Sequence, residues 1–157
     1  MGRISRISVV ILGIGLILAL QRTAWSDSKA DANLFKYAGG TERLRDGCSG
    51  ELKLSDESMT FQCPEGSITA LYRSIQLMQY RPDVSRQVWK MKLKWKVKPH
   101  DFGGKHNRYF TVVFTRAGRT HVMVLEVDPD EMRPYLAEID LKAGKRVQVW
   151  ELEVYDE

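Results

Sequence analysis

Cysteine is scarce in this sequence, and the motifs of common hydrolases are absent. The 157 residues include two cysteines and three histidines. They contain no Gly-x-Ser-x-Gly, no His-Glu-x-x-His and no Cys-x-x-Cys, so the usual signatures of serine hydrolases, zinc proteases and thioredoxin-like redox sites are missing. We therefore predict no catalytic residue and no cofactor, and we expect that the protein is not an enzyme.

No hydrophobic run reaches the length of about 20 residues that a helix needs to cross a bilayer. The longest run, from Ile7 to Leu20, follows two arginines and precedes small residues at Ala24 and Ser26. This three-part pattern is typical of a secretory signal peptide. We therefore predict that residues 1–26 are cleaved on export and that the mature chain is periplasmic or extracellular. An uncleaved amino-terminal anchor is the alternative.

Strong net charge is also missing once the leader is set aside. The chain has 24 basic and 20 acidic residues, a net charge of +4. Residues 1–26 hold three of the basic residues and no acid, so 24 minus 3 leaves 21 basic against 20 acidic residues, a net charge of +1. Domains that bind nucleic acid are usually strongly basic. We therefore predict no nucleic-acid partner.

An even pair of cysteines in an exported chain predicts a disulfide. Cys48 and Cys63 flank two alternating runs that are separated by the turn residues SDES. A two-residue turn at Ser55 and Asp56 would set Cys48 directly opposite Cys63. The β-carbons of such cross-strand pairs lie roughly 4.5–5.5 Å apart, close to the span of a disulfide. The alternative is a pair of buried free thiols or a redox role.

Short alternating segments continue beyond the cysteines and predict further strands. They are SITALYRSIQLMQY, KMKLKWKVK, RYFTVVF and THVMVLEV. Ala117 and Gly118 suit a tight turn between the last two. Residues 27–47 lack a sustained period, so we predict a linker or a short capping segment there, with Leu34, Phe35 and Tyr37 placed against the core.

One helix is predicted at about residues 129–143. Asp128 suits the cap, Pro129 suits the first helical position, and Gly144 suits the end. Pro134 argues against a regular helix over this range, because a proline inside a helix removes one backbone hydrogen bond. The residues after Gly144 alternate again and predict a last strand or an ordered tail.

Six to seven antiparallel strands followed by one helix predict a mainly β fold over residues 48–157. We expect a small barrel or sandwich with the helix at an open end. The segments CSGELKL, MTF and YRSIQLMQY, with the final hairpin and helix, resemble the pleckstrin-homology-like barrel of uncharacterised exported bacterial proteins. The resemblance covers about residues 45–144 and implies a non-catalytic interaction module. The partner is unknown.

Phosphoinositide binding is not part of what this resemblance implies. Pleckstrin-homology domains that bind phosphoinositides carry Lys and Arg around the first hairpin turn. We predict that turn at residues 55–58, which read SDES, with only Lys53 beside it.

The segment KMKLKWKVK predicts a strand with its lysines on one face and its apolar side chains toward the core. Three interpretations remain open. The lysines form a solvated edge that discourages strand pairing, or Glu151 and Glu153 of the tail pair against them. In the third, they bind an anionic partner such as phospholipid headgroups, a cell-wall polymer or an acidic protein. The candidate residues are Lys90, Lys92, Lys94, Lys96 and Lys98.

The Gly-rich loop at residues 98–107 holds the only other candidate chemistry. His100, Asp101 and His106 offer two imidazoles and a carboxylate, which are donors that zinc accepts. Their spacing matches no standard zinc motif. We therefore predict polar loop residues and no metal site, and a metal-dependent enzyme remains the weaker alternative.

Overall fold

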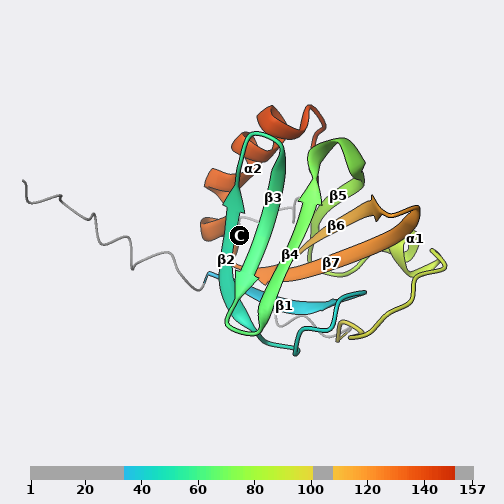
Figure 1. Ribbon diagram of the computed structural model, residues 1–157. Helices are drawn as coiled ribbons and strands as arrows, with labels where there is room; N and C mark the ends of the chain where they lie inside the picture. Colours follow the sequence, from blue (N-terminus) through green and yellow to red (C-terminus); the bar gives the residue numbers. More distant parts are fainter. Residues whose placement is uncertain (1–33, 101–107, 151–157) are drawn as a thin grey trace, which may run out of the picture.

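The computed structural model describes residues 34–100 and 108–150, and Figure 1 shows that strands dominate it. A helix, α2 (Pro129–Ala143), follows the last long strand, and a short helix, α1 (Arg86–Trp89), lies between β5 and β6. A turn of 3-10 helix, η1 (Tyr72–Ser74), separates β4 from β5. The strands are β1 (Phe35–Gly40), β2 (Ser49–Leu54), β3 (Ser58–Cys63), β4 (Gly66–Leu71), β5 (Ile75–Arg81), β6 (Arg108–Arg116), β7 (Arg119–Val127) and β8 (Gln148–Val149).

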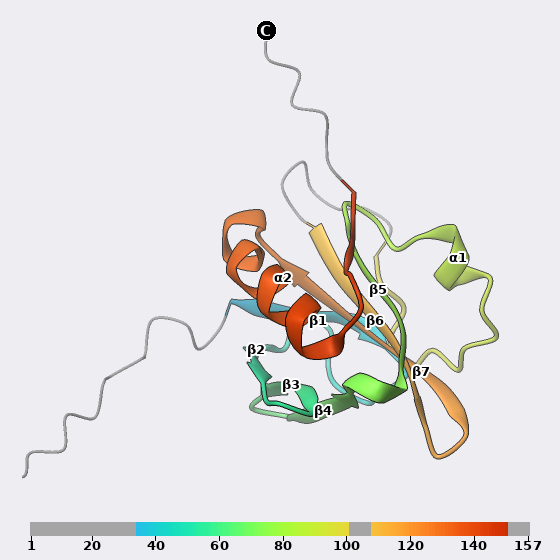
Figure 2. The same cartoon turned by 90° about the horizontal axis from the view of Figure 1, so that it is seen from above.

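The strands form one sheet with the order β4-β3-β2-β1-β7-β6-β5-β8. All neighbours are antiparallel except β5 and β8, which are parallel. Strand β1 pairs with β2 at its first two residues and with β7 along most of its length. It therefore joins a wall of β2, β3 and β4 to a wall of β5, β6 and β7, as Figures 1 and 2 show. Within the described residues the sheet does not close into a barrel.

Both faces of the β6–β7 hairpin are buried, because apolar side chains cover each of them. The larger cluster lies between the two walls and under α2; it includes Phe35, Phe61, Phe110, Met132 and Ile139. A smaller cluster covers the opposite face of β6 and β7, where α1 and the chain after it pack. Burial on both faces explains why these strands are continuous apolar runs rather than strict alternations.

The prediction of a mainly β fold with a carboxy-terminal helix is confirmed. Helix α2 begins after Asp128, whose side chain accepts a hydrogen bond from the Asp130 N–H, and ends at Gly144, which has φ +61°. The helix continues through Pro134. The Asp130 carbonyl, which loses its donor to the proline, belongs to an exposed residue of the first turn, so water can satisfy it. None of the described helices is long and apolar enough to cross a membrane.

The prediction of a linker or capping segment at residues 27–47 was wrong for residues 35–40. These residues form β1, a strand in the middle of the sheet. Phe35 and Tyr37 are fully buried, as the sequence predicted, but Ala38, Gly39 and Gly40 are buried as well. Because β1 is covered on both faces beyond Tyr37, its sequence does not alternate between apolar and polar residues. Hydrophobic periodicity therefore does not identify it as a strand.

The disulfide between Cys48 and Cys63 is confirmed, with the two Cα atoms 6.1 Å apart. The predicted register was wrong, because Leu54 pairs with Met59 and Leu52 with Phe61. The Ser55 N–H donates to the Ser58 carbonyl at 2.9 Å, so the turn residues are Asp56 and Glu57. Cys48 therefore precedes β2 and reaches Cys63 diagonally. The disulfide indicates that the protein resides in an oxidising, non-cytoplasmic environment.

Tyr80 supplies a prediction of alkaline sensitivity. Its side chain is buried, and its hydroxyl donates to the Val127 carbonyl at 3.2 Å. Burial raises the pKa of Tyr80 to about 12. An unfolded tyrosine has a pKa of about 10, so above pH 10 the unfolded chain releases this proton first and the free energy of unfolding falls.

We expect Tyr80→Phe to lower the free energy of unfolding by about 1 kcal/mol at pH 7, because the Val127 carbonyl loses its donor. The variant should also lose less stability than the wild type between pH 10 and pH 12. Urea unfolding at pH 7 and at several values above pH 9 measures both effects. If the free energy of unfolding of the variant falls with pH as steeply as that of the wild type, other groups cause the pH dependence. Tyr37 and Tyr72 are candidates, because burial raises their pKa values as well.

Candidate anion-binding surface

The predicted strand at Lys90 to Lys98 does not form, and this prediction was wrong. Trp89 ends α1, and the residues after it form an irregular chain. The one strand-like contact in the segment is a bridge between Val97 and Gly40, at the end of β1. Apart from this bridge, the backbone of the segment pairs with no described strand.

The alternation of exposure that the sequence predicted is nevertheless present. Every lysine from Lys90 to Lys98 is exposed, and each apolar residue between them is half-buried. Met91, Leu93 and Trp95 pack against the smaller cluster on the outer face of β6 and β7. The rings of Trp89 and Trp95 lie 4.8 Å apart, centroid to centroid. Apolar packing thus fixes the segment on the sheet and leaves the lysines in solvent.

The last part of the segment is fixed by close packing on β1. A Cβ atom at Gly39 would lie 2.7 Å from Pro99 Cδ, so only glycine leaves space for this ring. The Gly40 carbonyl accepts hydrogen bonds from the N–H groups of Lys96 and Val97, at 2.9 and 3.2 Å. His100 then contacts Asp46 at 3.1 Å. The segment is therefore tied to the loop that follows β1.

Positive charge is concentrated on this segment. From residue 84 to residue 100 the chain holds Arg86 and the five lysines and no acid. We call Lys90, Lys92, Lys94, Lys96 and Lys98 the lysine row. None of the five forms an ion pair with a residue that the structure describes. The row is therefore an uncompensated cationic surface within that part of the chain.

The described part of the tail, residues 148–150, pairs with β5 and not with the lysine row. Strand β8 pairs with β5, and the Trp150 N–H donates to the Tyr80 carbonyl at 3.0 Å. The Arg81 guanidinium lies 4.5 Å from the centroid of the Trp150 ring. This pairing places β8 at the edge of the sheet, beside β5. Glu151 and Glu153 lie outside the described residues.

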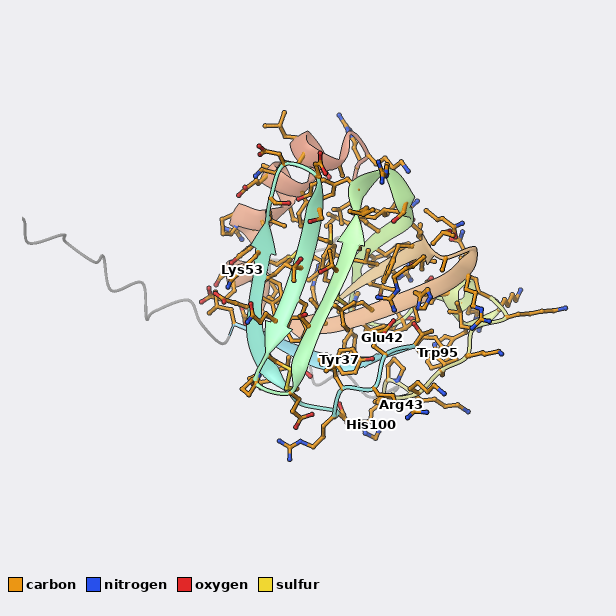
Figure 3. The ribbon with its side chains drawn as sticks, viewed as in Figure 1. Tyr37, Glu42, Arg43, Lys53, Trp95 and His100 are labelled. Atoms are coloured by element: carbon orange, nitrogen blue, oxygen red, sulfur yellow. A yellow bond between two sulfur atoms is a disulfide. The ribbon has the colours of Figure 1, made fainter. Side chains whose placement is uncertain are left out.

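The loop between β1 and β2, residues 41–48, carries a cation that the sequence analysis missed. Arg43 is exposed and forms no ion pair with a described residue, whereas Arg45 pairs with Glu65 at 3.0 Å. Figure 3 shows Arg43 on the side of the molecule where Trp95 and His100 lie. The prediction that residues 55–58 form the first hairpin turn was wrong, because β1 precedes β2 and pairs with it. The first turn is this loop, in which Arg43 adds to the lysine row.

Glu42 and His121 form the other cluster of ionisable groups on this side. The Glu42 carboxylate contacts His121 Nδ1 at 3.0 Å and also pairs with Arg116. The His121 ring stacks on Phe114, and Thr41 Oγ1 accepts a hydrogen bond from the Val122 N–H at 3.2 Å. These contacts join the loop after β1 to the β6–β7 hairpin. The cluster therefore holds the loop in place beside the lysine row.

The weak metal candidates fall largely outside the described residues. His100 is exposed and contacts Asp46, which was not a predicted ligand. Asp101 and His106 lie in the part of the loop that the structure does not describe. Among residues 34–100 and 108–150, no three His, Cys, Asp or Glu side chains are grouped as metal ligands.

Known proteins give no further indication of what this surface binds. No protein-family model matches the chain. No curated protein matches it either.

Proposed function

We propose that this protein is an exported, non-enzymatic binding module of pleckstrin-homology-like architecture that binds an anionic partner through the lysine row. The observation that carries the proposal is the exposed, unpaired row itself, held on the outer face of the sheet by the apolar side chains between its members. The sheet with its carboxy-terminal helix supports the architecture that the resemblance implies. The disulfide and the signal-peptide pattern support export.

A flat or extended anion fits this surface better than a small one. All five lysines are exposed on a chain that packs against the outer face of β6 and β7, and they line neither the hollow at Leu52 nor the one at Leu71. Each lysine near an anionic membrane contributes up to about 1 kcal/mol, which salt weakens within a Debye length. Phospholipid headgroups and anionic cell-wall polymers share this chemistry. Binding should therefore depend strongly on salt and weakly on the detailed structure of the anion.

The test is binding to vesicles of phosphatidylglycerol and phosphatidylcholine, measured by co-sedimentation at several salt concentrations. We expect a variant with Lys92, Lys94 and Lys96 changed to Gln to bind at least tenfold more weakly than the wild type at low salt. A matched variant changes Arg73, Arg133 and Arg146 to Gln, which removes the same charge from the side of η1 and α2. It should bind nearly as well as the wild type.

A parallel measurement with a soluble polyanion, polyglutamate, separates the two sources of negative charge. Binding to vesicles alone would identify a membrane surface, and binding to both would identify a general polyanion site. Equal losses in the two triple variants would mean that only net charge matters and would contradict the lysine row as the site. Failure to bind either probe at low salt would also exclude the proposal.

A further inference from the structure

A hollow lies between β2 and α2. It has a volume of about 450 Å³. Leu52 is buried at its base, while Leu54, Leu34 and Tyr135 line it and remain half-buried. Pro134 also lines it and is exposed on α2. Figures 1 and 2 show α2 running beside β2 in both views. Apolar side chains thus line a groove that is open to solvent.

One side of this groove is the edge of a strand. Strands β1 and β2 pair only through Phe35 with Gly50 and Lys36 with Ser49. Strand β2 continues to Leu54, and over residues 51–54 its only strand partner within the described chain is β3. The backbone groups of Leu52 and Leu54 that face away from β3 therefore have no strand partner among the described residues, and the Leu54 carbonyl accepts a hydrogen bond from Lys142. Such an edge can accept an added strand.

The other side of the groove is acidic. Glu131 and Glu138 line it from α2, and both are exposed. They lie seven residues apart, which is two helical turns or about 10.5 Å on one face. Glu138 contacts Lys142 at 3.2 Å, and Lys142 donates to the Leu54 carbonyl at 3.3 Å, which closes one end. Glu131 has no described ion-pair partner. The groove therefore combines an apolar floor, a strand edge with no strand partner among the described residues, and a negative rim.

We propose that this groove binds an extended cationic peptide segment of a partner protein, which adds as a strand to the edge of β2 that has no strand partner among residues 34–100 and 108–150. Basic side chains of the segment pair with Glu131 and Glu138, and an apolar side chain between them contacts Leu52 and Leu54. Alternate side chains of a strand face one way and lie about 6.8 Å apart. A basic-x-apolar-x-basic pattern therefore places both cations and the apolar group on the side of α2. This site is separate from the lysine row and does not depend on it.

The probe is the peptide acetyl-Lys-Thr-Leu-Thr-Lys-amide, titrated into the isotope-labelled protein and followed by amide chemical shifts. We expect shifts at Glu51 to Leu54 and along α2 at low salt. The peptide with Glu in place of both Lys should bind at least fivefold more weakly. Changing both Glu131 and Glu138 to Gln should weaken binding of the Lys peptide by about fivefold. A variant with Asp130→Asn is the matched control, because Asp130 is an exposed neighbour on the same helix that does not line the groove.

Several results would overturn the proposal. Equal binding of the Lys and Glu peptides would remove the role of the acidic rim, and shifts confined to other elements would place the peptide elsewhere. Protection of the β2 amides on the α2 side from hydrogen exchange in the free protein would mean that another segment or a second copy already covers the edge. The variant with Lys92, Lys94 and Lys96 changed to Gln should bind the Lys peptide as the wild type does. Loss of binding in that variant would contradict a separate site.

Discussion

Replacing Gly50 with alanine is expected to lower the free energy of unfolding by about 3 kcal/mol. Gly50 is buried in β2, next to the residue pair formed by Glu51 and Gln62. A Cβ atom at this position would lie 2.0 Å from the Gln62 carbonyl oxygen and 2.9 Å from Cys63 Cβ. The oxygen belongs to the backbone of β3, so the two strands must move apart. Forced overpacking of this kind costs about 1–3 kcal/mol, and an overlap with backbone lies at the upper end.

Urea unfolding of Gly50→Ala beside Gly118→Ala measures this effect. Gly118 has φ +71° in the β6–β7 turn, and a Cβ atom there meets nothing within 4 Å. Its substitution should cost about 1 kcal/mol through backbone conformation alone. A cost at Gly50 no larger than that at Gly118 would mean that β2 and β3 are farther apart at this point than the structure shows.

Reducing the disulfide is expected to cost about 3 kcal/mol. Cys48 and Cys63 are 15 residues apart in the sequence, and both are buried. In the chain-entropy description, closing a loop of this length removes conformations from the unfolded chain and stabilises the fold by about 3 kcal/mol. The bond also ties the start of β2 to the end of β3, where the Tyr37 N–H donates to the Cys48 carbonyl at 2.9 Å. Reduction should therefore loosen the contact of β1 with this wall.

The measurement is urea unfolding of the wild type with and without dithiothreitol. Complete reduction is checked by mass. A variant with both cysteines changed to alanine is the control, because it should unfold at the same urea concentration under both conditions. Equal stability of the oxidised and the fully reduced wild type would contradict the prediction. A response of the alanine variant to dithiothreitol would show that the reductant acts on something other than the disulfide.

In the β2–β3 hairpin, the alternation of apolar residues predicted which face each side chain occupies but not the register of the strands. Moving the turn by one residue, from Ser55–Asp56 to Asp56–Glu57, changes every cross-strand partner by two positions. A change of two keeps each side chain on the same face. The pattern therefore predicts which residues face the core, and the disulfide remains possible in either register. The hydrogen bonds of Ser55 decide between them, since its hydroxyl accepts from the Ser58 N–H at 3.1 Å.

For the lysine row, the sequence predicted correctly which side chains are exposed, but it predicted a strand where the chain is irregular. Alternate burial requires only that apolar side chains find a surface, and the outer face of β6 and β7 supplies one. Strand pairing requires a neighbour with free backbone groups, and among the described strands the segment pairs with Gly40 of β1 alone. Because a sequence does not state which strand edges are free, it did not distinguish a strand from a packed irregular chain.

Several features of this protein were determined by the sequence itself, because short-range chemistry decides them. These are the ends of α2 at Asp128 and Gly144, the turn at Ala117 and Gly118, and the pairing of the two available cysteines. Other features depend on contacts between distant residues. The place of β1 in the middle of the sheet, the parallel pairing of β8 with β5, and the open lysine row beside Arg43 were decided only by the tertiary structure. The reason is that each of these features depends on a surface or strand edge formed by residues that are distant in the sequence. A local pattern of residues does not specify which surface or edge a segment will contact.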